Sequence, residues 1–227
     1  MTLWNSPCTV GVRFVVSQGG SLKLRLIGLG LICALLLVGT GFADSVTLTG
    51  AGPANQDGVY VYPYTLNING TSYAAICDDY NHEVYVGESW TANIYNFSQY
   101  QSGRFGNEGL QNYEEAAWLL SQIPGAGAKE VGDINFAVWS LFTTGIPVQP
   151  QTSTLDGSAY WLTAATTAAN NNFYGMNFSN YRIVTPTDTG TGSAQEYLIT
   201  VPEPSSLLML GTGLIGLAGV VRKKLVR

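Results

Sequence analysis

The sequence predicts an α+β domain, with an antiparallel β-sheet or partial barrel and two or three helices inserted between early and late strands. Residues 45–77 are rich in β-branched and aromatic side chains and contain a turn signal, which is typical of strands. Between residues 110 and 170, apolar side chains recur every three or four positions, as they do in helices. Residues 181–201 return to a strand-like pattern, so the helices are expected to form an insertion.

The early strands include a well-marked hairpin. Tyr64–Ile68 and Thr71–Cys77 are β-branched and aromatic runs separated by Asn69-Gly70, a pair that favours the tight turns of hairpins. Cys77 is therefore expected at the end of a strand. Further early strands are predicted at residues 46–49, 59–62 and 90–95.

The middle of the chain predicts three helices, followed by two late strands. Pro124-Gly125 should stop the first helix, and Asp133 is expected to cap the second. The predicted helices are Leu110–Gln122, Asp133–Phe142 and Asp156–Asn170, and the late strands are Tyr181–Thr185 and Gln195–Val201.

Residues 1–43 have the pattern of an N-terminal extension followed by a secretory signal peptide. Lys23 and Arg25 precede an apolar run at Leu26–Val38, and Gly41-Phe42-Ala43 places small residues at the positions that signal peptidases require. We therefore expect a signal helix that is removed after export. The alternative is an N-terminal anchor that is never cut.

The C-terminal residues 201–227 have three parts in a fixed order. Pro202, Glu203 and Pro204 come first, and an uncharged apolar stretch follows at Leu207–Val221. The basic residues after it are Arg222, Lys223, Lys224 and Arg227. This stretch predicts a transmembrane helix slightly shorter than a full span, with its basic end in the cytoplasm.

The order of Pro-Glu-Pro, apolar helix and basic end resembles the PEP-CTERM protein-sorting signal of Gram-negative bacteria, also called the ice-binding protein C-terminal domain. The resemblance implies that an exosortase, a membrane transpeptidase, recognises the tail at the inner membrane. The protein would then pass from an inner-membrane-anchored precursor to the cell surface or the extracellular space. A plain single-pass anchor is the alternative.

Residues 44–200 form the predicted extracellular body, and its charge excludes one class of partner. Up to Val201 it holds three Lys or Arg residues against fourteen Asp or Glu residues, a net charge of −11. Nucleic-acid binding needs a basic face, so a nucleic-acid partner is not expected. Cys77 is the one cysteine of this body, which excludes a disulfide within the mature chain.

Signs of catalysis are scarce, and we expect neither a conventional enzyme nor a bound metal or cofactor. His82 is the only histidine of the chain and is expected at the surface. Asp78 and Asp79, with two nearby glutamates, are expected to be solvated carboxylates. A pair such as Asp78 and Glu114 remains open as the two carboxylates of a glycosidase.

Three blocks of the body, residues 75–80, 113–119 and 133–139, resemble the thioester domains of bacterial surface adhesins. In that family a strand cysteine bonds to the glutamine of a Gln-x-Ala-Ile-Trp motif, and the acyl group then captures amines. The corresponding residues here are Cys77 and Asn135, and asparagine is one methylene shorter than glutamine. We therefore expect an unreacted, buried Cys77 that lies near Asn135 at the start of a helix.

The leading functional interpretation is a cell-surface or extracellular-matrix protein with a structural or adhesive body. One alternative is a covalent adhesin that uses a Cys77 thioester. The other is a glycan-binding module, with an exopolysaccharide or a neighbouring surface as partner. Its aromatic residues would include Trp90, Trp118, Trp139 and Trp161, although Trp118 and Trp139 fall on predicted helix faces and are expected to be core.

Replacing Pro202, Glu203 and Pro204 together with alanine should leave the protein in the inner membrane, because the prolines hold the segment extended for the sorting enzyme. Cell fractionation and immunoblotting measure where the protein accumulates. Normal arrival of the alanine variant at the cell surface would show that the tail is an ordinary anchor.

Overall fold

The computed structural model describes residues 43–202, except 53–54, 151, 153–155, 189 and 191. The predicted signal helix and the predicted C-terminal transmembrane helix lie outside these residues. Within the described part, no helix has the length and apolar character needed to cross a membrane.

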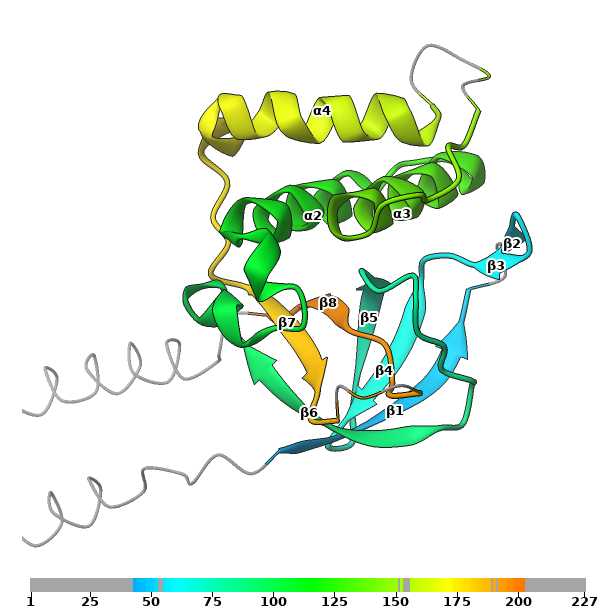
Figure 1. The fold of residues 1–227 in the computed structure, drawn as a ribbon, viewed down its shortest axis with the longest axis vertical. Helices are drawn as coiled ribbons and strands as arrows, with labels where there is room; N and C mark the ends of the chain where they lie inside the picture. Colours follow the sequence, from blue (N-terminus) through cyan, green and yellow to red (C-terminus); the bar gives the residue numbers. More distant parts are fainter. Residues whose placement is uncertain are drawn as a thin grey trace, which may run out of the picture. The chain divides into compact units, whose positions relative to one another are not determined.

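Six antiparallel strands close into a barrel in the order β1-β4-β5-β8-β7-β6 (Figure 1). The strands are β1 (Asp44–Ala51), β4 (Tyr64–Ile68), β5 (Thr71–Cys77), β6 (Ser89–Tyr95), β7 (Tyr181–Pro186) and β8 (Tyr197–Thr200). The barrel closes, rather than remaining partial, because β1 pairs on both edges: Val46 lies opposite Ile68 of β4 and opposite Trp90 of β6. A register shift between Leu48 and Gly50 marks a bulge, which adds the twist that closure needs.

The barrel has two distinguishable ends, because all neighbouring strands run antiparallel. The chain enters β1 at Asp44 and leaves β8 at Thr200, and both positions belong to the same end, here called the terminal end. At the opposite end, here called the loop end, β5 finishes at Cys77 and the following loop, residues 78–88, leads into β6.

Three α-helices lie between β6 and β7 and cover one side of the barrel (Figure 1). They are α2 (Leu110–Gln122), α3 (Ala128–Phe142) and α4 (Ser158–Asn170), accompanied by the short 3₁₀ helices η1 (Phe97–Ser102), η2 (Gly106–Glu108) and η3 (Asn172–Gly175). Figure 1 shows α4 on the outer side of α2 and α3, and α4 packs against both. The prediction of an α+β domain with inserted helices is confirmed.

Helix α3 begins earlier than the sequence suggested. Glu130 accepts a hydrogen bond from the Gly127 N–H at 2.7 Å, which satisfies a backbone donor at the start of the helix. Asp133 is therefore an interior residue and not the N-cap. Its buried carboxylate accepts hydrogen bonds from Gln56 Nε2 at 2.9 Å and Lys129 Nζ at 2.7 Å.

Asp133 also fixes the position of a small hairpin. Where a strand was expected at residues 59–62, the structure has a two-stranded hairpin of β2 (Asn55–Gln56) and β3 (Val59–Tyr60). The bond from Gln56 to Asp133 attaches this hairpin to α3, which places Tyr60 beside the loop end of the barrel.

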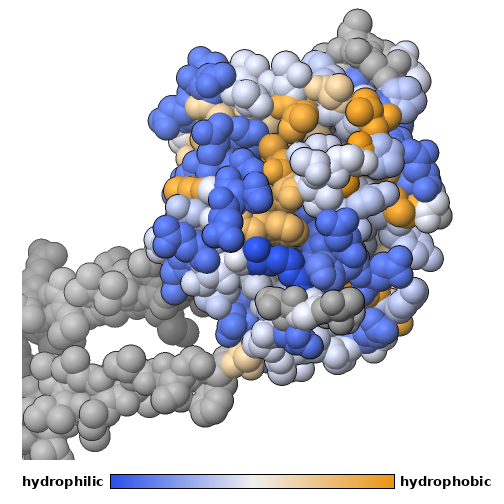
Figure 2. All heavy atoms as spheres, viewed as in Figure 1, coloured by the Kyte–Doolittle hydropathy of each residue, from blue (hydrophilic) through white to orange (hydrophobic). Residues whose placement is uncertain are grey.

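The core has two parts that share the barrel wall. Side chains such as Cys77 of β5 pack inside the barrel, and Phe136 and Trp139 of α3 join them. Ile76 of β5 and Leu198 of β8 face the other way and pack with the helices. On the face seen in Figure 2, the exposed hydrophobic residues form small patches separated by hydrophilic ones.

Candidate functional site

A pocket of about 630 Å³ lies at the loop end of the barrel and is rich in aromatic side chains. Its aromatic residues are Tyr60, Tyr64, Tyr80, Tyr85 and Trp139, and its polar residues are His82, Glu83 and Gln195. They come from the β2–β3 hairpin, β4, the 78–88 loop, α3 and the approach to β8. We call this site the aromatic pocket.

The inner part of the aromatic pocket is rigidly packed, whereas its rim is open. Trp139 is only 2% exposed and meets the Tyr80 ring edge-on, with the ring centroids 5.1 Å apart. Tyr64 makes a similar contact with Tyr197 inside the barrel. Tyr60 and Tyr85 form the rim and are 59% and 65% exposed, so both leave much of their surface open to a ligand.

The 78–88 loop is held against β1 by backbone hydrogen bonds. The Gly87 N–H donates to Leu48 O at 2.8 Å, and the Leu48 N–H donates to Glu88 O at 3.0 Å. Gly87 has a φ of 100°, a left-handed conformation that favours glycine at this turn. Tyr85 is fixed further, since its N–H and its hydroxyl donate to Glu88 and Glu83, each at 2.9 Å.

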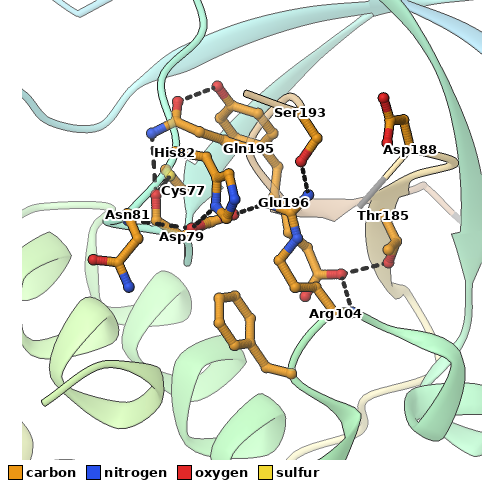
Figure 3. Close-up of polar contacts among 12 residues, drawn as sticks. Cys77, Asp79, Asn81, His82, Arg104, Thr185, Asp188, Ser193, Gln195 and Glu196 are labelled. Atoms are coloured by element: carbon orange, nitrogen blue, oxygen red, sulfur yellow. Dashed lines mark hydrogen bonds and ion pairs between the residues drawn. The ribbon is translucent and has the colours of Figure 1, made fainter. Parts of the chain in front are cut away.

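His82 is held by a buried carboxylate instead of lying free on the surface. Its Nδ1 is 2.9 Å from Asp79 Oδ1, and Asp79 has no exposed surface (Figure 3). Asp79 also forms an ion pair with Arg104. Because the imidazole lines the aromatic pocket and Nδ1 is occupied, Nε2 is the ring nitrogen available to a ligand.

The expectation that Asp78 and Asp79 are solvated is wrong, because both are fully buried. They follow the end of β5 and lie beside Glu196, at the approach to β8, where the Asp78 N–H donates to Glu196 O at 3.4 Å. Asp78 therefore cannot reach a substrate as one carboxylate of a glycosidase pair. Sequence patterns gave no signal for this burial, since the partners of these aspartates are distant in the chain.

Arg104 contacts the buried acidic residues Asp79 and Glu196. In addition to its ion pair with Asp79, its Nη2 donates to Ser193 Oγ at 2.6 Å and its N–H donates to Glu196 Oε2 at 2.7 Å (Figure 3). The Tyr113 hydroxyl of α2 donates to the other oxygen of Glu196 at 2.8 Å. We call these residues, with Asp78, the Arg104 cluster.

The Arg104 cluster contains three buried carboxyl groups and one guanidinium. Ionising all three carboxyl groups would therefore cost free energy, because one positive charge cannot compensate three negative ones. Burial raises the pKa of Asp78 well above its usual value, and the nearby Glu196 and Asp79 raise it further. Burial also raises the pKa of Glu196, although hydrogen bonds from Thr185, Arg104 and Tyr113 oppose this. Neither oxygen of the Asp78 carboxyl has a hydrogen-bond partner among the described residues, so nothing offsets the lost hydration of an ionised Asp78.

Cys77 and Asn135 are brought together, but through the backbone and not through the sulfur. Asn135 Nδ2 donates to Cys77 O at 3.1 Å, and Asn135 Oδ1 accepts from the Tyr62 N–H at 2.9 Å. Asn135 lies within α3, farther from its start than predicted. Its amide therefore clamps α3 to the end of β5, which is a structural role.

The Cys77 thiol is enclosed and protonated. The side chain has no exposed surface, and Sγ donates to Asp79 O at 3.2 Å. Burial raises the pKa of the Cys77 thiol well above its usual value, with further increases from Asp78 and Asp79. The Trp139 side chain and the Asp79 backbone act in the opposite direction, but burial dominates.

The remaining predicted site residues concern the tail and the tryptophans. Val201 donates its N–H to Asn180 O at 2.7 Å, and Pro202 after it is exposed. The rest of the predicted sorting residues, Glu203, Pro204, Arg222, Lys223, Lys224 and Arg227, lie outside the described residues.

Trp118 and Trp161 pack against the helical core. Between residues 43 and 202, as far as they are described, no group of three or more His, Cys, Asp or Glu side chains is placed to hold a metal ion.

Comparison with known proteins identifies the tail alone. Residues 200–223 match the PEP-CTERM protein-sorting motif, which supports export and sorting by a C-terminal signal. The motif implies recognition by an exosortase, a membrane protein. No curated protein and no solved structure matches the chain, so the resemblance of the body to thioester domains gains no support.

The buried acid Asp78 predicts an unusual dependence of stability on pH. An unfolded Asp titrates near pH 3.9, whereas folding raises the Asp78 pKa, so this group's contribution to the free energy of unfolding falls as pH rises above about 4. The Asp78→Asn variant removes this loss and should be about 1–2 kcal/mol more stable than the wild type at pH 7.5. The two proteins should converge near pH 4.

Urea denaturation between pH 4 and pH 8 measures this difference. The exposed carboxylate Glu108 provides the control, because Glu108→Gln should leave the pH dependence unchanged. A lower stability of Asp78→Asn at pH 7.5 would show that Asp78 is ionised in the folded protein.

The body should also have its full mass, with one thiol that alkylates slowly until the protein unfolds. Thioester formation would expel ammonia, but the Asn135 amide is already committed to two backbone groups. Mass spectrometry of the body before and after methylamine treatment tests this. A mass lower by one ammonia, which methylamine then raises, would contradict the prediction.

Proposed function

We propose that this chain is an exported cell-surface or extracellular-matrix protein that is sorted by an exosortase at the inner membrane and binds saccharides in its aromatic pocket. The observation that carries the proposal is this pocket, whose lining combines two exposed tyrosines at the rim with the buried aromatic residues Tyr64 and Trp139. Its volume of about 630 Å³ lies in the range of small-molecule sites.

The chemistry of the aromatic pocket suits a sugar ring. A pyranose presents apolar C–H groups on its faces and hydroxyl groups around its edge. The rings of Tyr60 and Tyr85 provide flat apolar surfaces for those faces, while His82 Nε2 and Gln195 provide polar atoms for the hydroxyls. His82 is already oriented by Asp79, so binding would cost little side-chain entropy.

We propose binding and not catalysis. Among its described lining residues the pocket has no serine, threonine or cysteine that could act as a nucleophile beside His82. The position of the pocket also suits adhesion, because it lies at the loop end, whereas the chain reaches the sorting motif from the terminal end. An exopolysaccharide or a neighbouring surface is the partner that this arrangement favours.

The covalent adhesin is a second candidate, favoured only by the contact between Asn135 and Cys77. That contact uses the Cys77 carbonyl, and the sulfur is fully enclosed. An amine on another surface would have to reach a group with no exposed area. The aromatic pocket therefore carries the stronger proposal.

Replacing either Tyr60 or Tyr85 with alanine should weaken saccharide binding about tenfold, because a stacked aromatic ring contributes roughly 1 kcal/mol or more. Titration calorimetry of the full chain in detergent, with hexasaccharides of glucose, N-acetylglucosamine and glucosamine, measures the dissociation constants. Tyr174→Ala is the matched control, since Tyr174 is 68% exposed and does not line the pocket.

If none of these saccharides binds to the wild type, the proposal fails. It also fails if both rim variants bind as tightly as the wild type. Thermal unfolding of each variant checks that a loss of binding is not a loss of folding.

A further inference from the structure

A second pocket of about 400 Å³ adjoins the aromatic pocket at the loop end. Glu83 lines both pockets, and the segment at residues 192–195 contributes to both. The lining of the second pocket includes three carboxylates, one indole and several hydroxyls: Glu83, Glu88, Asp188, Trp90, Ser89, Thr91, Thr187 and Ser193. We call it the acidic pocket.

The carboxylates of the acidic pocket carry uncompensated charge. Within the part of the chain that the structure describes, Glu83, Glu88 and Asp188 form no ion pair. Glu83 and Glu88 each accept a hydrogen bond from Tyr85, and Asp188 accepts one from the Gly190 N–H at 2.9 Å. These bonds hold the carboxylates in place without neutralising them.

The cation that contacts the lining of this pocket, Arg104, is already paired. Arg104 donates to Ser193, which lines the acidic pocket, but the Arg104 side chain is only 9% exposed and forms an ion pair with Asp79. Asp188 projects away from the Arg104 cluster (Figure 3). A ligand in the acidic pocket therefore meets three carboxylates and no free cation among the described lining residues.

The acidic pocket also has the features of a sugar site. Trp90 provides an aromatic wall and is fixed by stacking on Tyr197 inside the barrel, with the ring centroids 6.2 Å apart. Hydroxyl groups such as those of Thr91 and Thr187, which are 2.6 Å apart, also line the acidic pocket. An aromatic wall, hydroxyls and unpaired carboxylates together suit a ring that carries both hydroxyl and ammonium groups.

We propose that the two pockets form one groove that selects saccharides with positively charged amino groups, such as polymers of glucosamine. This inference rests on the proposed saccharide binding in the aromatic pocket. Sugar rings stack in the aromatic pocket, and the ammonium groups of neighbouring units pair with Glu88 and Asp188. The uncompensated charge attracts such a chain and repels one built from uronic acids.

The test compares glucosamine hexasaccharide with glucose hexasaccharide on the full chain in detergent. At pH 5.5 and low salt the amino groups are charged and ordinary carboxylates are ionised. We expect the glucosamine oligomer to bind about tenfold more tightly, since two exposed ion pairs contribute up to about fivefold each. Added salt should reduce this preference.

The double variant Glu88→Gln, Asp188→Asn should lose the preference and bind glucose hexasaccharide as the wild type does. Both replacements retain an acceptor oxygen for the Tyr85 and Gly190 N–H groups, so the loop should keep its shape. Glu108→Gln is the control, because it removes an exposed carboxylate that lines neither pocket.

Three outcomes would overturn the inference. The wild type could bind both oligomers equally, or the preference could survive in the double variant. Tetralysine could also bind as tightly as the glucosamine oligomer, which would mean that the groove recognises basic peptides. Each of these leaves saccharide binding in the aromatic pocket intact if glucose hexasaccharide still binds, whereas no binding of any saccharide removes the proposed function itself.

Discussion

Arg104 holds the loop end of the barrel together through its buried ion pair with Asp79. A carboxylate with no exposed surface is stable only when a charge or several donors compensate for its lost hydration. Arg104 provides this compensation from the segment between β6 and α2, and its backbone N–H reaches Glu196 at the approach to β8. One residue thus connects the end of β5, the start of the helical insertion and the approach to the last strand.

The geometry of the binding pockets depends on this connection. Asp79 is fixed by Arg104 and in turn orients His82 toward the aromatic pocket. Glu196 accepts the Tyr113 hydroxyl, which ties α2 to the barrel, while Asn135 ties α3 to the same end of β5. The position of Trp139 in the aromatic pocket therefore depends on where these polar groups attach the helices to the barrel.

Local features of the fold were predictable from sequence, and long-range ones were not. Asn69-Gly70 marks the β4–β5 hairpin, and Pro124-Gly125 marks the end of α2, because turn and stop signals act within a few residues. Barrel closure, and the burial of Asp78 and Asp79, depend on partners far along the chain. The aromatic pocket could not be predicted from the sequence for the same reason, since its residues come from separate segments with no common spacing.

The distribution of negative charge separates the acids that build the fold from those that face a ligand. In the Arg104 cluster, the guanidinium pairs with Asp79, and burial raises the pKa of Asp78. Glu88 and Asp188 lie at the same end of the barrel without a cation beside them in the described structure. Solubility can be provided by carboxylates anywhere on the surface, but it does not require three of them to line one pocket that adjoins exposed tyrosines. Their placement makes the loop end, and not the body as a whole, the part of the molecule that a cationic saccharide would meet.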